Sequence, residues 1–368
     1  LARVPSASDP LRAGLQQGGT NKDVWVVAGD RGEGAGAERR TMHARVSIRR
    51  TSGEVSSRAA DDLFWLGRSV ERLDSCGRAL RAALQRVVAG APGTRERAEL
   101  EATLRLLERC GVLAIGTAAG SSRGTSARWP LLSAFAPGAL FEATLSAVER
   151  LASAVRDRFS ADMRRTLNHM LGDLRRRLGG AHADADRALD LLDELLRLSA
   201  AVSGLASENM IRGSGWRFLD LGRRVERGIY VVRVVLAVIG EMPAMSDAAL
   251  RLTLELCDST ISYRTRYLAA LLEAPVLDLI LLDATNPQSL AFQIEGVSAH
   301  VAALPRLACG DPVAAARDAC DELSELVAGL EPGAASGVAA LRIPLARAES
   351  GLMALSDALN ASYFAHVG

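Results

Sequence analysis

The chain of 368 residues carries 44 basic and 43 acidic side chains, a formal net charge of +1, which excludes attraction to nucleic acid or anionic lipid through a global field. Hydrophobic residues make up 49% of the chain and aromatic residues only 4%, with Leu, Ala and Val supplying most of the apolar mass, which favours packed helices over β-sandwiches. The length admits one large domain or two ordinary ones.

Cysteine usage and apolar runs bear on the compartment. The five cysteines form no Cys-x-x-Cys motif, and an odd number in a long chain does not indicate a disulfide framework, so we expect a reducing, cytoplasmic location. No apolar run reaches the roughly 20 residues of a membrane-spanning helix, and no signal peptide is visible, so no membrane partner is expected. Because the chain starts at Leu1 without a methionine, we expect a piece of a longer polypeptide.

Residues 1–52 differ in composition from the rest of the chain. They are rich in Gly, Ser and Pro, with a short β-like run, DVWVVA, at 23–28 and a linker-like stretch at 29–40. This pattern predicts the end of one domain followed by a tether, with a second domain at 53–368.

From Ser56 onward, apolar residues recur every three or four positions, which is typical of helices. We predict about ten helices, at 56–89, 94–115, 138–158, 160–178, 183–211, 214–239, 246–272, 287–303, 312–330 and 336–364. Helix caps are predicted at Thr94, Ser160, Ser246 and Asn286-Pro287. The predicted fold is an all-α multi-helix bundle with a short non-helical or β-containing N-terminal tail.

Two of these helices share a motif. WLGRSVER at 65–72 and DLGRRVER at 220–227 both contain Leu-Gly-Arg-x-Val-Glu-Arg, 155 residues apart, which indicates a duplicated half-bundle or a shared site. Gly67, Arg68 and Glu71 fall away from the main apolar stripe of their helix. Glycine costs about 1 kcal/mol of helix propensity against alanine, so we expect it to allow close approach of another helix or to make room for a side chain. The two motif helices are therefore predicted to pack face to face.

These residues resemble a known family. The stretches 57–72, 215–227, 255–267 and 277–289 are similar, in order, to four segments of alpha-E proteins, and the resemblance covers about residues 55–365. The chain departs from the family pattern at Leu73 and Gly228, where alanine is usual, and at Gln288, where arginine is common. The last departure weakens any role for Gln288 as a charged contact.

The head of the chain has a separate resemblance. Residues 1–4 and 16–26 are similar to the C-terminal end of circularly permuted ATP-grasp proteins. This resemblance implies an ATP-grasp domain, fused or encoded nearby, that makes or modifies peptides by ATP-dependent amide ligation. ATP and Mg²⁺ are then expected in the missing upstream domain, and no cofactor in this chain, which lacks a complete catalytic set. Lys22, beside a Gly-Gly turn, is the one residue here that could reach a phosphate, although an ordinary turn before a strand explains it as well.

The strongest polar constellation lies in the segments that carry the first resemblance. The ligand-binding candidates are Arg68, Glu71, Trp216, Arg223, Glu226, Asp258, Tyr263, Arg264, Asp278 and Asn286. Arginine among paired Arg and Glu suits a carboxylate or phosphate ligand, but the same residues can form a buried salt-bridge network that sets helix register. Asp278 and Asn286 fit caps and turns better than catalytic acids.

Other chemistries are disfavoured. A di-iron bundle needs Glu-x-x-His motifs, and no glutamate stands three residues before any of His169, His182, His300 and His366, so no metal site is expected. Cys76 and Cys257 lie in apolar helices and are expected to be buried and inert. The arginines between 156 and 177 alternate with acids and indicate a solvated face, so no nucleic-acid partner is expected.

Two functions remain open. We expect an accessory or interaction domain that serves an ATP-grasp peptide or amide ligase and grips its acceptor or carrier peptide. The alternative is that the helical domain is itself an enzyme that acts on a peptide product through its Arg/Glu clusters. Convergence of Glu71, Arg223 and Glu226 on an open pocket favours the enzyme, and mutual pairing in a closed core favours the scaffold.

Overall fold

The computed structural model describes residues 2–4, 20–22, 55–90, 93–120, 127–238, 246–267, 270–304, 314–331 and 338–364. The chain divides into two compact units, 1–50 and 51–368. In the first unit, strand β1 (Ala2–Val4) pairs antiparallel with β2 (Thr20–Lys22), with Ala2 opposite Lys22. The predicted β-like run at 23–28 and the linker at 29–40 lie outside the described residues.

The second unit is all-α in its described residues, as predicted. Its helices are α1 (Ser57–Val88), α2 (Thr94–Arg109), α3 (Thr117–Gly120), α4 (Arg128–Ser133), α5 (Leu140–Ala154), α6 (Ala161–Ala181), α7 (Ala185–Asn209), α8 (Ser214–Val238), α9 (Asp247–Leu256), α10 (Thr260–Tyr267), α11 (Glu273–Leu277), α12 (Leu290–Ala302), α13 (Ala314–Ala328) and α14 (Arg342–Leu359). Short 3₁₀ turns occupy Arg156–Arg158 and Val338–Leu341, and π-helical turns Asp278–Leu282 and Asn360–Phe364. None of the described helices has the length and apolar character that crossing a bilayer requires.

Two of the predicted caps are confirmed and two are wrong. The side chains of Ser160 and Ser246 accept hydrogen bonds from first-turn N–H groups of α6 and α9. Thr94 is instead the first helical residue of α2, because the extended Gly93 takes the cap position. Asn286-Pro287 precedes α12 by a turn, and Ser289 caps that helix through the N–H of Phe292.

The predicted helix 246–272 is interrupted. Asp258 adopts a left-handed conformation with φ of 48°, which ends α9 and lets the chain turn into α10. The sequence pattern also missed α11 and the π-helical turn after it, which place the apolar side chains of 276–277 and 279–281 in the core. Pro275 is tolerated there because it lies in the first turn, where its missing N–H has no helical partner.

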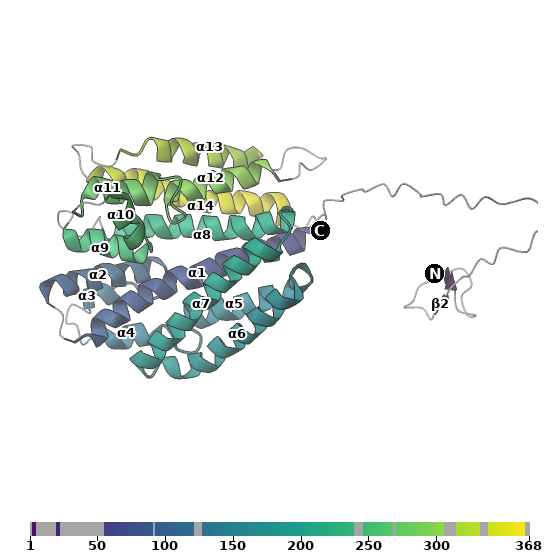
Figure 1. The fold of residues 1–368 in the computed structure, drawn as a ribbon, viewed down its shortest axis with the longest axis horizontal. Coiled ribbons are helices and arrows are strands. Elements are labelled where there is room, and N and C mark those ends of the chain that lie inside the picture. Colours follow the sequence, from purple (N-terminus) through teal and green to yellow (C-terminus); the bar gives the residue numbers. More distant parts are fainter. Residues whose placement is uncertain are drawn as a thin grey trace, which may run out of the picture. The chain divides into compact units, whose positions relative to one another are not determined.

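Helices α1 and α8 form the centre of this unit and make its most extensive helix–helix contact. Figure 1 shows α5, α6 and α7 on one side of this pair and α12, α13 and α14 on the other. Both central helices have buried residues along nearly their whole length, and most of these residues are leucine, alanine or valine. The pair therefore has packed helices on both faces, which encloses any polar group at its crossing.

Two glycines allow this crossing. A Cβ on Gly67 would lie 2.1 Å from the carbonyl oxygen of Leu219, and a Cβ on Gly222 would lie 2.0 Å from that of Phe64. The two contacts are reciprocal. On either side of the crossing, Gly215 lies next to Leu63 and Arg227 bonds to Glu71, so contacting residue numbers rise together and α1 and α8 run in the same direction. The predicted face-to-face packing of the two motifs is confirmed.

Candidate functional site

One turn beyond the glycine crossing, the two Glu-Arg pairs exchange partners. Arg227 donates to Glu71 through Nε (2.6 Å to Oε1) and Nη2 (2.8 Å to Oε2). Arg72 donates to Glu226 in the same way, from Nε (2.6 Å to Oε1) and Nη2 (3.1 Å to Oε2). Each arginine thus forms a two-pronged bond with the glutamate of the other helix. We call these four residues the Glu–Arg clasp.

The clasp follows from the crossing. Glycines let the backbones meet closely, so side chains four and five residues further on reach across rather than along their own helix. The carboxylates are almost fully enclosed, with Glu71 2% and Glu226 4% exposed. A buried charge of this kind is tolerated only when it is paired and hydrogen-bonded, which the exchange achieves twice.

The electrostatics keep the clasp ionised. Burial would raise the pKa of Glu226, but the charges and hydrogen bonds of Arg68 and Arg72 outweigh it and hold that pKa below its usual value. Burial likewise lowers the pKa of Arg227, and Glu71 more than offsets this, so the pKa of Arg227 is raised. Glu226 and Arg227 therefore both stay charged near neutral pH.

Each motif has a further arginine next to the clasp, Arg68 on α1 and Arg223 on α8, and the two differ in their hydrogen bonding. Arg68 is saturated: Nε lies 2.8 Å from Glu226 Oε2, Nη1 donates to Ser356 Oγ at 2.8 Å, and the guanidinium lies 5.0 Å from the ring centroid of Trp65. Arg223 lies 3.8 Å from Glu71 and 3.5 Å from Asp220, and its buried Nε has no hydrogen-bond partner. Burial lowers the pKa of Arg223, with the attraction of Glu71 opposing it.

Asp220 on α8 belongs to a further cluster of polar side chains, which was not predicted from the sequence. Its Oδ2 lies 2.8 Å from His300 Nε2 on α12 and accepts from Arg224 Nε at 2.6 Å. Burial would raise the pKa of Asp220, but His300 and Arg224 hold it well below its usual value. Trp216, a predicted candidate, stacks edge-on against His300 with ring centroids 5.0 Å apart, and Arg212 lies over its other side at 4.2 Å.

The third family segment supplies structural contacts and one free cation. Asp258 pairs with Arg78 of α1 at 3.0 Å. The buried hydroxyl of Tyr263 donates to Ala270 O and accepts from Leu272 N, both at 3.2 Å, which ties α10 to the start of α11. Arg264 is exposed, and it makes no hydrogen bond or ion pair within the described part of the chain.

In the fourth segment, Asn286 forms a turn before α12, and Asp278 holds Tyr267 of α10. Asn286 is 5% exposed, donates to Leu279 O at 2.9 Å, and accepts from the N–H of Gln288 at 3.1 Å. Asp278 is exposed and accepts from the hydroxyl of Tyr267 at 2.6 Å. These side chains hold the α10–α12 region together. Their role in ligand binding stays a prediction, as does that of the clasp residues.

Arg264 and Tyr263 line an open cleft of about 530 Å³ between α9, α10 and the start of α11. Its other lining residues are Asp247, Arg251, Leu254, Glu255, Thr260, Ala270 and Leu271. Asp247 pairs with Arg251 at 3.3 Å, and Glu255 with Arg86 at 2.7 Å, so these charges are already matched. Arg264 is the lining charge with no protein partner among the described residues, and Leu254 and Leu271 add apolar side chains to the lining.

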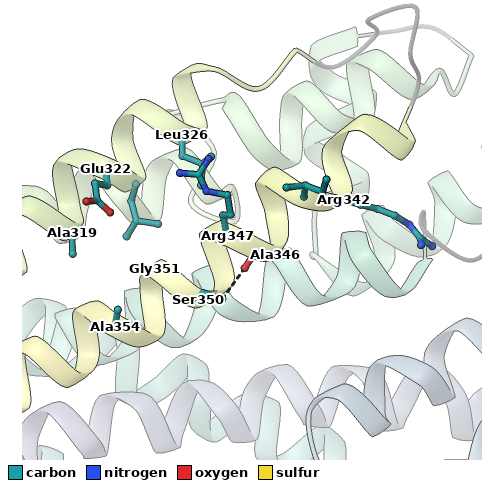
Figure 2. A pocket seen from close by; sticks show the side chains of 11 residues that line it. Ala319, Glu322, Leu326, Arg342, Ala346, Arg347, Ser350, Gly351 and Ala354 are labelled. Atoms are coloured by element: carbon teal, nitrogen blue, oxygen red, sulfur yellow. Dashed lines mark hydrogen bonds between the residues drawn. The ribbon is translucent and has the colours of Figure 1, made fainter.

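A second groove, of about 570 Å³, runs between α13 and α14 (Figure 2). Arg347 reaches from α14 toward Leu326 on α13, and Ser350 donates to its own helix at Ala346 O, 3.1 Å away. None of the predicted site residues lines this groove.

Within the described ranges, no group of three or more His, Cys, Asp or Glu side chains is placed to hold a metal ion. The clasp carboxylates, the most enclosed acids near the centre, are already neutralised by arginine. These donors do not suit a magnesium–nucleotide complex. The side chain of Lys22 lies outside the described residues, so its phosphate contact stays a prediction.

Comparison with known proteins assigns the chain to a family. The Alpha-E family model, described as a predicted alpha-helical domain with a conserved ER motif, matches residues 55–364. Uncharacterized proteins of Mycobacterium tuberculosis and Mycobacterium bovis are each 30% identical over 304 residues, which cover 77% of this chain and 34% of theirs. The chain therefore spans about a third of the length of these relatives. No solved structure matches.

Proposed function

The chain belongs to the Alpha-E family, and from this we propose that residues 53–368 form an accessory helical domain that grips a peptide for a circularly permuted ATP-grasp ligase. The ligase would make or modify peptides by forming amide bonds. The ER motif of the family is, in this proposal, the Glu–Arg clasp, whose task is to fix α1 against α8.

The observation that carries the proposal is the mutual pairing within the clasp. Both carboxylates are buried and bonded to arginine, and Arg68 is saturated as well. A catalytic acid, base or nucleophile must be free to meet its substrate, and these groups are not. The clasp supports a rigid scaffold, on which a binding surface is carried elsewhere.

The ATP-grasp partner is supported by the head of the chain and by the relatives. Residues 1–4 and 16–26 resemble the end of such a protein, and the relatives have about two thirds of their length beyond the matched part. That length is ample for a ligase domain. ATP and Mg²⁺ would bind in that domain, because the described residues of this chain do not fit them.

We place the peptide in the cleft that contains Arg264. The Arg264 guanidinium has no partner among the described residues and suits a peptide carboxylate, and Leu254 and Leu271 in the lining suit an apolar side chain of the peptide. The cleft is lined by the third family segment, while the tied hydroxyl of Tyr263 keeps its wall in place. The acceptor or carrier peptide is thus held by one charge pair and apolar contact.

The test uses the ATP-grasp protein together with this chain, fused or co-expressed. ADP release in the presence of amino acids and peptides is compared with and without residues 53–368, and with Arg264→Gln. We expect Arg264→Gln to raise the KM for the peptide about tenfold or more, with the KM for ATP unchanged, because one charge-assisted hydrogen bond is lost. Arg251→Gln is the matched control, because this arginine lines the same cleft but is paired with Asp247. Ligation that is unchanged without residues 53–368 would remove the accessory role.

Arg223 favours a second candidate, an enzyme that acts on the peptide product. It alone among the motif arginines has a buried Nε with no partner, in the part of the chain that the structure describes. A substrate carboxylate would complete its bonding. ATP-independent turnover of the ligated peptide by the purified chain, lost in Arg223→Gln but not in Arg251→Gln, would support this candidate over the accessory role.

A further inference from the structure

A small cavity of about 10 Å³ lies against the outer side of the Glu–Arg clasp. It is lined by Arg72, Ser75, Cys76, Cys110, Glu226, Ile229, Tyr230 and Arg233. This volume holds about one water molecule. The proposed ligase role does not use the cavity, and its lining is unusual in combining two thiols with two arginines.

The two thiols come from different helices. Cys76 lies on α1 and is 5% exposed, whereas Cys110, at the C-cap of α2, is partly exposed. Both are free, and their side chains interact through a hydrogen bond. Both cysteines line the same cavity, from two different helical positions.

Their surroundings make the two thiols unequal. The hydrogen bond to Cys110, together with burial, raises the pKa of Cys76 well above its usual value. The same hydrogen bond, with the charge and hydrogen bond of Arg233, lowers the pKa of Cys110 against burial and the repulsion of Glu226. Of the two thiols, Cys110 is thus the one that loses its proton more readily. Glu349, which bonds Arg233 at 2.7 Å, holds that guanidinium in place.

Tyr230 provides an independent sign that a small ligand fits here. Its side chain is 6% exposed and lines the cavity, and its hydroxyl has no hydrogen-bond partner among the described residues. A buried hydroxyl without a partner is costly, so an oxygen atom in this cavity would stabilise it. Water and a peroxide oxygen both have the right size and chemistry.

We propose that Cys110 and Cys76 form an oxidisable dithiol that reacts with peroxides. The Cys110 thiolate attacks one peroxide oxygen, the O–O bond breaks, and the leaving hydroxide takes a proton to become water. The Tyr230 hydroxyl faces the oxygen that bears the new charge. Cys76 then loses its proton and attacks Sγ of the Cys110 sulfenic acid, the S–O bond breaks, and a second water leaves. In sum, two thiols and one hydrogen peroxide give one disulfide and two waters, so two electrons pass to the peroxide.

The first experiment treats the reduced full-length chain with hydrogen peroxide and measures its intact mass. We expect a loss of about 2 Da, with a peptide map that joins Cys76 to Cys110. Cys76→Ala should stop at the sulfenic acid, which dimedone traps, and Cys110→Ser should give neither product. Cys257 is the internal control, because burial raises its pKa to about 12 and should leave it unmodified.

The second experiment measures the alkylation rate of Cys110 with iodoacetamide against pH. We expect its midpoint below the usual thiol value of about 8.5, with Arg233→Gln shifting it upward. This readout does not depend on the disulfide, and circular dichroism confirms that the variants fold. An ordinary thiol midpoint for Cys110, or peroxide oxidation that leaves Cys76 and Cys110 unlinked, would overturn the proposal.

Discussion

Replacing Gly67 with alanine probes the α1–α8 crossing directly. The new Cβ would lie 2.1 Å from Leu219 O, while ordinary contacts begin at 3.4 Å, so the two helices must separate by about 1 Å. The obstacle is backbone, which cannot rotate away as a side chain can. The change therefore acts on the whole interface rather than on one rotamer.

The expected change in the free energy of unfolding follows from this separation of the two helices. Overpacking of this kind costs about 1–3 kcal/mol, and a gap of about 1 Å forfeits up to half of the dispersion energy at the contact. The four clasp bonds, now 2.6–3.1 Å long, would lengthen too. Alanine returns about 1 kcal/mol of helix propensity. We expect Gly67→Ala to lower the free energy of unfolding by about 2 kcal/mol, which is the upper overpacking cost less the helix propensity that alanine returns.

Urea unfolding followed by circular dichroism measures this loss. Gly204→Ala on α7 is the matched control: its Cβ would meet nothing within 4 Å, and we expect a gain of about 0.5–1 kcal/mol. Adding Gly222→Ala to Gly67→Ala should cost less than Gly222→Ala alone, because the helices are already apart. If Gly67→Ala matches or exceeds the stability of the natural protein, the close crossing is refuted.

Two further predictions concern charge. Glu226→Gln leaves the buried Arg68 and the partly exposed Arg72 without their carboxylate, and should lower the free energy of unfolding in urea by about 3 kcal/mol; equal stability would mean that the clasp is not held by charge. Because the pKa of Asp220 is lowered on folding, its contribution to stability is complete above pH of about 4 and is lost as the pH falls through the folded value. The difference in urea midpoint between the natural protein and Asp220→Asn should therefore shrink below pH of about 4, and a difference that stays constant down to pH of about 2 would contradict this account.

The sequence was sufficient to predict the central pair of helices. The repeat at 65–72 and 220–227 places a glycine and a Glu-Arg pair at the same positions of two helices, and symmetric contacts follow from symmetric residues. What the helical wheel did not reveal is the exchange of partners, because a wheel describes one helix at a time. The arginine that neutralises Glu71 is 156 residues away.

The errors in the fold arose where backbone geometry departs from periodic patterns. Nothing in the apolar spacing of 246–272 marks Asp258 as left-handed, although aspartate tolerates that conformation better than most residues. Near α12, the side chain of Asn286 is occupied by buried contacts, so Ser289 caps the helix instead. Such choices depend on neighbours that the local sequence does not contain.

The site residues that were not predicted also depend on contacts between segments far apart in the sequence. His300 has no acidic residue at ligand spacing, yet Asp220 reaches it from another helix. Cys110 stands at the end of a helix predicted to continue to residue 115, and the early end of α2 at Arg109 places this thiol at a turn beside Cys76. The signal that the sequence offers is a pair of polar residues, one on a motif helix and one on a later helix.

The exchange within the clasp also constrains how the chain matures. At a synthesis rate of about 5–20 residues per second, the Glu-Arg pair of α1 leaves the ribosome roughly 10–30 s before its counterpart on α8, and Ser356 follows later still. Until then, Glu71 has no cationic partner from α8, so the first helices cannot settle into a buried core on their own. Folding of this domain is therefore a late, long-range event, and nascent chains that end before α8 are expected to depend on chaperones or to aggregate.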